Sequence, residues 1–229
     1  MEAFYYSQMS KVEQAVYHAM KAGFSEMMTS FLVPRVEAKA LGEVFFRMRL
    51  DHPEIFYAVN FKYRSYRDSN NLEIIPEYLF EKSKVKEHQK AMKARVEKLV
   101  RPAAKMNEKE KEQYIHDFIC QNVHYDKLKK AYSHEIIGPL GQGVGVCEGI
   151  AKTVKILCDN LGSGASLQYQ RRIRRNRSNT VMRGILCGLT ASIIIWMRHL
   201  TIHLEKTLLR FGMIILIWTI PGCSVTMSL

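Results

Sequence analysis

The chain changes character at Gly162, and this change limits how much of it can form an ordinary folded domain. Residues 162–229 hold nine Lys and Arg but one acidic residue, Glu205, so they carry +8 of the formal net charge of +12. Residues 1–161 are nearly balanced, with 25 basic and 21 acidic residues. The sequence leaves open whether residues 163–229 fold. Residues 163–229 are expected to be an aberrant basic and apolar tail.

The first 105 residues are expected to form a helical region with one β-hairpin. Capping boxes at Ser10–Glu13 and Asn107–Glu110 predict two helix starts. Helices are also expected over about 36–50 and 82–101. The aromatic and apolar runs at 55–67 and 72–80 flank a DSNN turn, which predicts a hairpin. We expect its aromatic rings to pack in the core or at a sheet edge, rather than to stack on nucleic acid bases.

The stretch GVGVCEGIAK, residues 143–152, places a cysteine at the start of a predicted helix over 148–161. It follows a long glycine-rich loop, 121–145, and such loops often carry function. A helix start lowers the pKa of a thiol placed there, which makes Cys147 a candidate nucleophile. The backbone N–H groups of this turn could hold an oxyanion. On position alone, a buried cysteine that serves only as a small apolar side chain is the competing interpretation.

A longer stretch, YIHDFICQNVHYD followed by SHEIIGPLGQGVGVCEGIAKTVKILCDNLG, resembles bacterial transglutaminase-like proteins of the papain-like cysteine protease superfamily. DHPEIFYAVNFKY and IIPEYLF resemble their N-terminal region. The resemblance implies an α+β fold: N-terminal helices with a small hairpin, then a papain-like core that begins at residues 106–162. It implies that Cys147 is the nucleophile, that Gly145, Val146 and His134 support its loop or an oxyanion, and that the substrate is a protein or peptide amide.

The resemblance ends at Gly162. The family sheet carries a His in GHAW-like residues and an Asp in YYHLDATFD-like residues, and the chain has neither. However, when each codon is read from the third base of the preceding one, residues 190–203 can encode GKYYHLDATFDNS. Trp and Met each have a single codon, so in this frame Trp196–Met197 must yield the Asp of HLD. In the same frame, 212–219 can encode YDYFNLD and 178–185 YGNAGH. We therefore interpret the chain as frameshifted near residue 162. We expect it to be inactive, with an incomplete core sheet that leaves the cysteine helix with exposed apolar surface.

Other histidines and one aspartate are weaker candidates for the site. His199 and His203, four residues apart, could share a metal ion or supply a base, but no acidic ligand is near them in sequence. His116 and His124 lie upstream of the cysteine loop. Asp126 is interpreted as a loop or cap residue rather than a triad acid.

The alternative function is non-enzymatic. The run RRIRRNR at 171–177 could bind anionic surfaces such as lipid or nucleic acid by charge alone. It lacks interleaved aromatic residues, so no specific nucleic acid is expected.

The remaining expectations concern setting and partners. The five cysteines include no pair with zinc spacing, so no metal or other cofactor is expected. The first residues show no basic stretch followed by an apolar one, so neither a signal peptide nor export is expected, and we place the protein in the cytoplasm. The apolar runs at 185–197 and 213–220 are shorter than the about 18 residues of a membrane span. The oligomeric state stays open.

Overall fold

A computed structural model describes residues 3–163, 165–171 and 181–187, and it shows the expected α+β fold. The helices and strands, in chain order, are α1 Lys11–Ser25, β1 Phe31–Pro34, α2 Ala38–Asp51, β2 Ala58–Ser65, β3 Asn71–Tyr78, α3 Lys82–Val100, α4 Glu108–Asn122, β4 His124–Tyr125, β5 Val144–Gly145, α5 Cys147–Asn160, β6 Ala165–Arg171 and β7 Val181–Cys187. No helix in these ranges is long and apolar enough to cross a membrane.

Both predicted capping boxes are confirmed. Ser10 Oγ accepts from the Glu13 N–H at 3.4 Å, and the Ser10 N–H donates to the Glu13 carboxylate at 2.9 Å. Asn107 and Glu110 make the same reciprocal pair at 3.0 and 2.9 Å. These bonds satisfy backbone N–H groups that a helix start leaves without partners, so they define where α1 and α4 begin.

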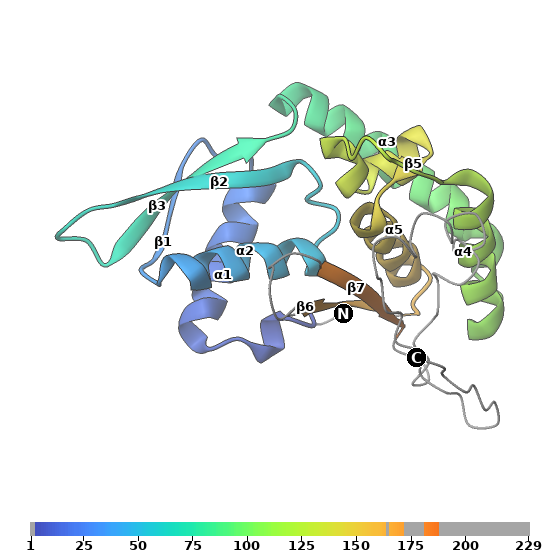
Figure 1. The fold of residues 1–229 in the computed structure, drawn as a ribbon, viewed down its shortest axis with the longest axis horizontal. Coiled ribbons are helices and arrows are strands. Elements are labelled where there is room, and N and C mark those ends of the chain that lie inside the picture. Colours follow the sequence, from blue (N-terminus) through green and yellow to red (C-terminus); the bar gives the residue numbers. More distant parts are fainter. Residues whose placement is uncertain (1–2, 164, 172–180, 188–229) are drawn as a thin grey trace.

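A three-stranded antiparallel sheet, in the order β1-β3-β2, covers the N-terminal helices on one side. Its long β2–β3 hairpin is the predicted one and projects at the left of Figure 1, where α1 and α2 lie behind and below it. β1 was not predicted. It is four residues long and ends in Pro34, so it carries no usable alternation of its own, and its pairing with β3 creates it.

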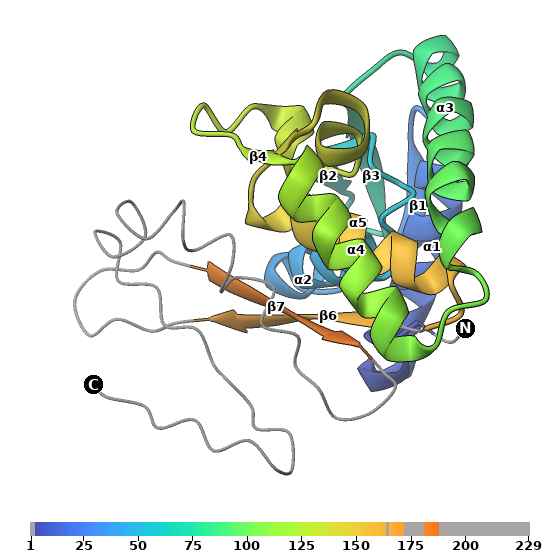
Figure 2. The same ribbon diagram turned by 90° about the vertical axis from the view of Figure 1, so that its right-hand side faces the viewer.

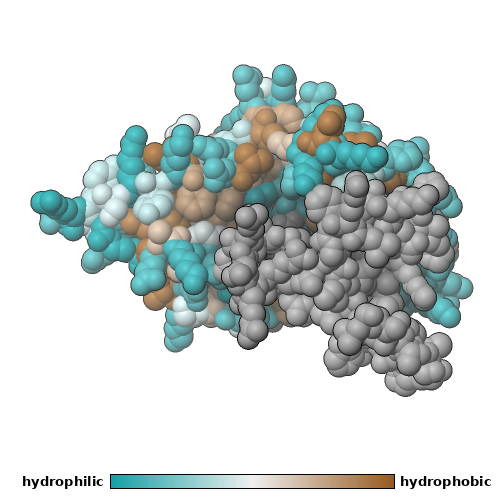
Figure 3. Space-filling view, in the orientation of Figure 1, coloured by the Kyte–Doolittle hydropathy of each residue, from teal (hydrophilic) through white to brown (hydrophobic). Residues whose placement is uncertain are grey.

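The aromatic residues in and around the hairpin range from buried to exposed. Phe56 and Tyr57 are buried, as expected. Tyr63, on the edge strand β2, and Tyr66, in the turn, are 46% and 51% exposed, so neither ring lies in the core, and Tyr63 takes the sheet-edge position that the prediction also allowed. The tip at the left of Figure 3 has a hydrophilic surface, and Tyr66 donates its hydroxyl to Glu73 at 2.9 Å. The hairpin extends beyond the helices that would have covered these rings.

α5 lies between α3 and α4 on one side and the β6–β7 hairpin on the other (Figures 1 and 2). Ten of its 14 residues are buried. The expectation that this helix exposes apolar surface is therefore wrong, and Ile150, Val154 and Leu157 all lie in the core. One hydrophobic cluster runs from Met9 to Leu167, so the core is continuous across residue 105.

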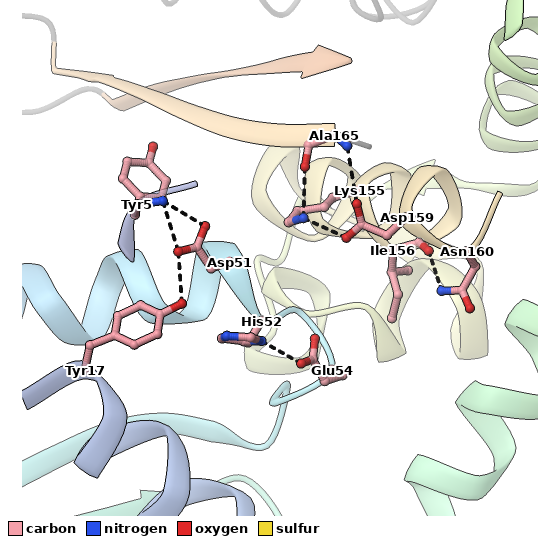
Figure 4. Close-up of polar contacts among 10 residues, drawn as sticks. All are labelled: Tyr5, Tyr17, Asp51, His52, Glu54, Lys155, Ile156, Asp159, Asn160 and Ala165. Carbon is pink, nitrogen blue, oxygen red and sulfur yellow. Dashed lines mark hydrogen bonds and ion pairs between the residues drawn. The ribbon is translucent and has the colours of Figure 1, made fainter. Parts of the chain in front are cut away.

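The first strand after Gly162 is held by main-chain hydrogen bonds and by two buried side chains, Ala165 and Leu167. Tyr5 donates its hydroxyl to the Leu167 carbonyl at 2.6 Å, and Lys155 donates to the Ala165 carbonyl at 2.9 Å. The ammonium of Lys155 also pairs with Asp159 at 2.6 Å, and the Ala165 N–H donates to that carboxylate (Figure 4). Main-chain groups are the same for every residue type, so these hydrogen bonds do not depend on the side chains of β6, whereas the burial of Ala165 and Leu167 does.

Tyr5 itself is anchored to α2. Its N–H donates to the Asp51 carboxylate at 3.1 Å, and the Tyr17 hydroxyl donates to the same carboxylate at 3.0 Å (Figure 4). Burial raises the pKa of Asp51, while the bonds from Tyr5 and Tyr17 oppose that rise. Among the described residues, the sheet beside α5 consists of β6 and β7, consistent with an incomplete core sheet.

Candidate functional site

Cys147 is the first residue of α5, as the sequence indicated. Val146 precedes it in an extended conformation, with φ −93° and ψ 173°, and no side chain caps the helix start. The positive end of the helix dipole therefore lies at the thiol, which is partly buried. A helix N-terminus of this kind is one of the settings in which reactive cysteines occur.

The cysteine loop is tied to the end of α4 by a short parallel pairing of β4 with β5. The His124 N–H donates to the Gly143 carbonyl at 2.8 Å, and the Asp126 N–H donates to the Gly145 carbonyl at 3.0 Å. Gly143 turns the chain into β5 with φ +65°, a conformation that favours glycine. This pairing places Tyr125 near the thiol. Burial raises the pKa of Tyr125, and the negative charges of Cys147 and Asp126 raise it further.

Gly145 and Val146 both support the loop. A Cβ on Gly145 would lie 2.8 Å from Pro139 Cγ, so the loop packs where only glycine fits. The Val146 N–H donates to the Ser133 carbonyl at 3.0 Å, which commits that amide to the loop in this conformation. An oxyanion would therefore have to use the N–H groups of the first turn of α5.

Gly149 is a site residue that the sequence analysis missed. A Cβ at this position would overlap the Ser133 carbonyl oxygen and approach the Glu135 carbonyl at 3.1 Å. α5 therefore contacts the 133–135 segment through bare backbone, one turn after Val146. The signal that could have found it was a glycine inside an otherwise regular helical pattern, which often marks close packing.

Asp126 holds the loop that follows β4, which confirms its interpretation as a loop residue. Its carboxylate accepts from the N–H groups of Leu128 and Lys130, each at 2.9 Å, and from Ser133 Oγ at 2.5 Å. The Ser133 hydroxyl, followed by the Lys130 N–H, lowers the pKa of Asp126 because these bonds favour the charged form. Asp126 thus fixes Ser133, the residue that receives the Val146 amide.

A buried ion network lies directly beneath the site. Lys152 is fully buried and donates to both carboxylate oxygens of Glu135 at 2.7 Å. Arg49, from α2, pairs with the same Glu135 carboxylate, and Glu148 lies 3.2 Å from Lys152 Nζ. Burial lowers the pKa of Lys152, and Arg49 lowers it further, while the two glutamates oppose the shift.

Sequence reasoning missed this network. Glu148 and Lys152 stand four residues apart on α5, and such a pair is normally read as a solvated ion pair. Glu135 and Arg49 are 86 positions apart, so no local pattern joins them.

His134 stands at the outer end of this network. Its Nδ1 lies 3.2 Å from Glu148 Oε2, and its side chain is 40% exposed. The structure thus brings His134 to the start of α5. Within the part of the chain that the structure describes, no histidine is hydrogen-bonded to Cys147 Sγ.

The remaining candidates lie elsewhere. His116 lies on α4, 3.1 Å from Asp117 and 3.5 Å from the exposed Cys120 Sγ, and His124 is exposed on β4. His199, His203 and residues 172–177 fall outside the described residues. In the described ranges, no group of three or more His, Cys, Asp or Glu could hold a metal ion.

Comparison with known proteins finds no matching family model and no matching curated protein. The case for a function therefore depends on the site's own residues.

Proposed function

We propose that this chain derives from a transglutaminase-like cysteine enzyme and that Cys147 occupies the position of its nucleophile. The observation that carries the proposal is the place of Cys147, at the first position of a helix with no side-chain cap. The ordered loop around it, fixed by Asp126 and Ser133 and packed without side chains at Gly145 and Gly149, gives further support. A helix start is one of the settings that activate a thiol, and a rigid loop keeps the thiol in place for attack.

In the complete enzyme the thiolate would attack the carbonyl carbon of a protein or peptide amide. A histidine would take the thiol proton and give it to the leaving amine, and an aspartate would orient that histidine. The resulting thioester would then react with water, giving hydrolysis, or with a second amine, giving transfer. Both outcomes need the same three groups.

We further propose that this chain is inactive because its reading frame shifts near residue 162. The His and Asp strands of the family are absent from the sequence after that point. The members of such a triad act as a unit, so loss of the base removes most of the rate. Main-chain hydrogen bonds to the β6 carbonyl groups are compatible with an altered sequence in this strand, because they do not depend on its side chains.

Restoring the frame tests this proposal. Insertion of one base near codon 162 should yield a chain that contains HLDATFD and releases ammonia from a glutamine-containing peptide, or forms a covalent adduct with an amine. The original chain and the restored chain with Cys147→Ser, the matched control, should do neither. Failure of the folded restored chain to react with a panel of glutamine peptides would contradict the proposal.

The nucleotide sequence gives a second, independent check. The frame that begins at the third base of each codon should encode YYHLDATFD across residues 192–200. If that frame encodes an unrelated sequence, the frameshift is ruled out.

The alternative function is that of a basic protein that binds anionic surfaces through its arginine run. The +8 charge of residues 162–229 is the observation that favours it. Binding to anionic vesicles or duplex DNA would then fall steeply as salt rises, and deletion of residues 172–229 would abolish it. Binding that persists after this deletion would contradict the alternative.

A further inference from the structure

We propose that α3 carries a binding surface for the phosphate backbone of duplex DNA, without preference for base sequence. This surface is separate from the Cys147 site and from the arginine run, so the inference goes beyond both functions considered above. It starts from the charge of the helix. Residues 82–101 hold eight Lys and Arg against two Glu, and all of these charged residues are exposed.

A narrow apolar stripe holds α3 to the rest of the molecule. Val85, Met92 and Val96 are its buried residues, and their spacing of seven and four places them on one side of the helix. The helix packs against α5 and forms the upper edge of the molecule in Figure 1 and the right edge in Figure 2. Figure 3 shows hydrophilic side chains along this upper edge. Most of the circumference of α3 is therefore open to a partner.

The positive charges of α3 are not neutralised by carboxylates of the described residues. Within that part of the chain, none of these Lys and Arg forms an ion pair. Glu97 stands four residues from Lys93 and from Arg101, and it pairs with neither. Residues 162–229 contain one acidic side chain, Glu205, and so offer little negative charge. The anion that complements α3 must therefore come from another molecule.

The arrangement of the lysines weakens the helix when it stands alone. Lys82, Lys86 and Lys90 follow one another at intervals of four residues, where like charges repel. A solvated helix face commonly alternates charges of both signs, as α4 does with EKEKE over Glu108–Glu112. A row that repels itself is stabilised when an anion lies along it, which favours a binding role over a merely solvated face.

The basic residues lie in two rows on the exposed side of α3. At 3.6 residues per turn, one row consists of Lys82, Lys86, Lys90 and Lys93. The other row consists of Lys84, Arg95 and Lys98. The small residues Ser83 and Ala94 lie between the rows, together with Glu87. A helix with side chains is about 10–12 Å across, and the major groove of B-form DNA is about 12 Å wide. The two rows therefore suit the phosphates on the two sides of this groove.

Duplex DNA fits this surface better than other polyanions do. Helices that lie in a membrane surface insert large apolar side chains such as Trp, Phe and Leu, and the exposed positions of α3 hold none of these. Single-stranded nucleic acid binds by stacking on aromatic rings, and α3 contains no Phe, Tyr or Trp. The major groove of A-form RNA is too narrow for side chains to enter. Lysines contact phosphates rather than base edges, so no base sequence is preferred.

The test is the affinity of the full chain for a duplex DNA of mixed sequence, measured by fluorescence anisotropy over about 50 to 200 mM salt. Every chain in the test carries Gln at four arginines of the arginine run, so that this run does not contribute: Arg172, Arg174, Arg175 and Arg177. In this background, the triple variant Lys86→Gln, Lys90→Gln and Lys93→Gln should bind at least about tenfold more weakly at about 100 mM salt. The slope of log K against log salt should fall by about 2–3, since each lost phosphate contact removes about 0.9.

A matched control separates this surface from net charge. The triple variant Lys11→Gln, Lys39→Gln and Lys127→Gln removes the same charge from exposed positions on α1, on α2 and in the loop after β4, and it should change the affinity less than about twofold. Arginine in place of Lys86, Lys90 and Lys93 should retain binding, because the charge remains. Glu87→Gln should tighten binding severalfold, because it removes the carboxylate between the rows.

Three outcomes would overturn the inference. The first is an equal loss of affinity in the two triple Lys→Gln variants, which would show that net charge alone matters. The second is a chain that no longer binds DNA once the four arginines are changed, which would assign binding to the arginine run. The third is tighter binding, at equal salt, to vesicles that contain phosphatidylserine or to duplex RNA than to duplex DNA. None of these measurements depends on Cys147 or on acyl transfer.

Discussion

At the scale of single residues, the site depends on positions where a side chain is absent as much as on the thiol. Gly145 and Gly149 lie on either side of Cys147, and both approach the neighbouring loop too closely for a Cβ. The thiol is thus held between two tight contacts. The sequence predicted Cys147 from its position, and the structure adds that Gly145 packs against Pro139.

We expect Gly149→Ala to destabilise the fold by about 1–3 kcal/mol, because the added methyl group overlaps the Ser133 carbonyl and the helix must move. Gly42→Ala is the matched control. Gly42 is also inside a helix, α2, but a Cβ there meets nothing within 4 Å. That change should leave stability equal or raise it by about 0.5–1 kcal/mol. Urea unfolding of both variants measures the difference, and equal effects would contradict the proposed close contact.

At the scale of elements, the loop after β4 is organised by one carboxylate. Asp126 binds two backbone N–H groups and the Ser133 hydroxyl, and so sets the path of the chain toward the cysteine loop. The capping boxes of α1 and α4 and the β2–β3 hairpin could be predicted because their signals lie within a few residues. The detailed path of residues 126–146 could not, because it depends on contacts with α5.

Asp126 makes stability depend on pH in the acid range. Its folded-state pKa lies below the ordinary 3.8, so its contribution is complete above pH 4 and is lost as pH falls through the lower folded value. Denaturant titrations at pH 7, 4 and 2.5 should therefore show Asp126→Asn less stable than the original chain at pH 7. The gap should narrow toward pH 2.5. A gap that stays constant over this range would show that the carboxylate charge is not involved.

At the scale of the whole molecule, the N-terminal region and the cysteine helix are joined by buried charges as well as by apolar packing. Arg49 comes from α2, Glu135 from the loop before η4 (Gly138–Gln142), and Lys152 from α5. Glu135 and Lys152 are 2% and 0% exposed. A charged side chain buried this deeply is tolerated only when its partners are in place. The network therefore requires these three segments to meet in one arrangement.

We expect Lys152→Met alone to cost about 3–5 kcal/mol, because Glu135 and Glu148 then lose their buried cation. Glu135→Gln alone should cost a comparable amount. The double variant should lose clearly less stability than the sum of the two single variants, since each change removes the charge that the other leaves without its partner. A double-mutant cycle from thermal or urea unfolding measures this coupling, and additive effects would show that the pair does not interact.

The sequence by itself determined the helix starts, the long hairpin, the placement of Cys147 at the head of α5 and the change of character at Gly162, because caps, periodicity and composition act over short stretches. Only the tertiary structure decided that α5 is buried, that Arg49 and Lys152 share Glu135, that Gly149 touches Ser133, and that β1 forms on β3. Each of these depends on partners distant in sequence. The same reason applies to the position of β6. Tyr5 and Lys155 bind its carbonyl groups, and the side-chain pattern of a sequence contains no signal for such main-chain contacts.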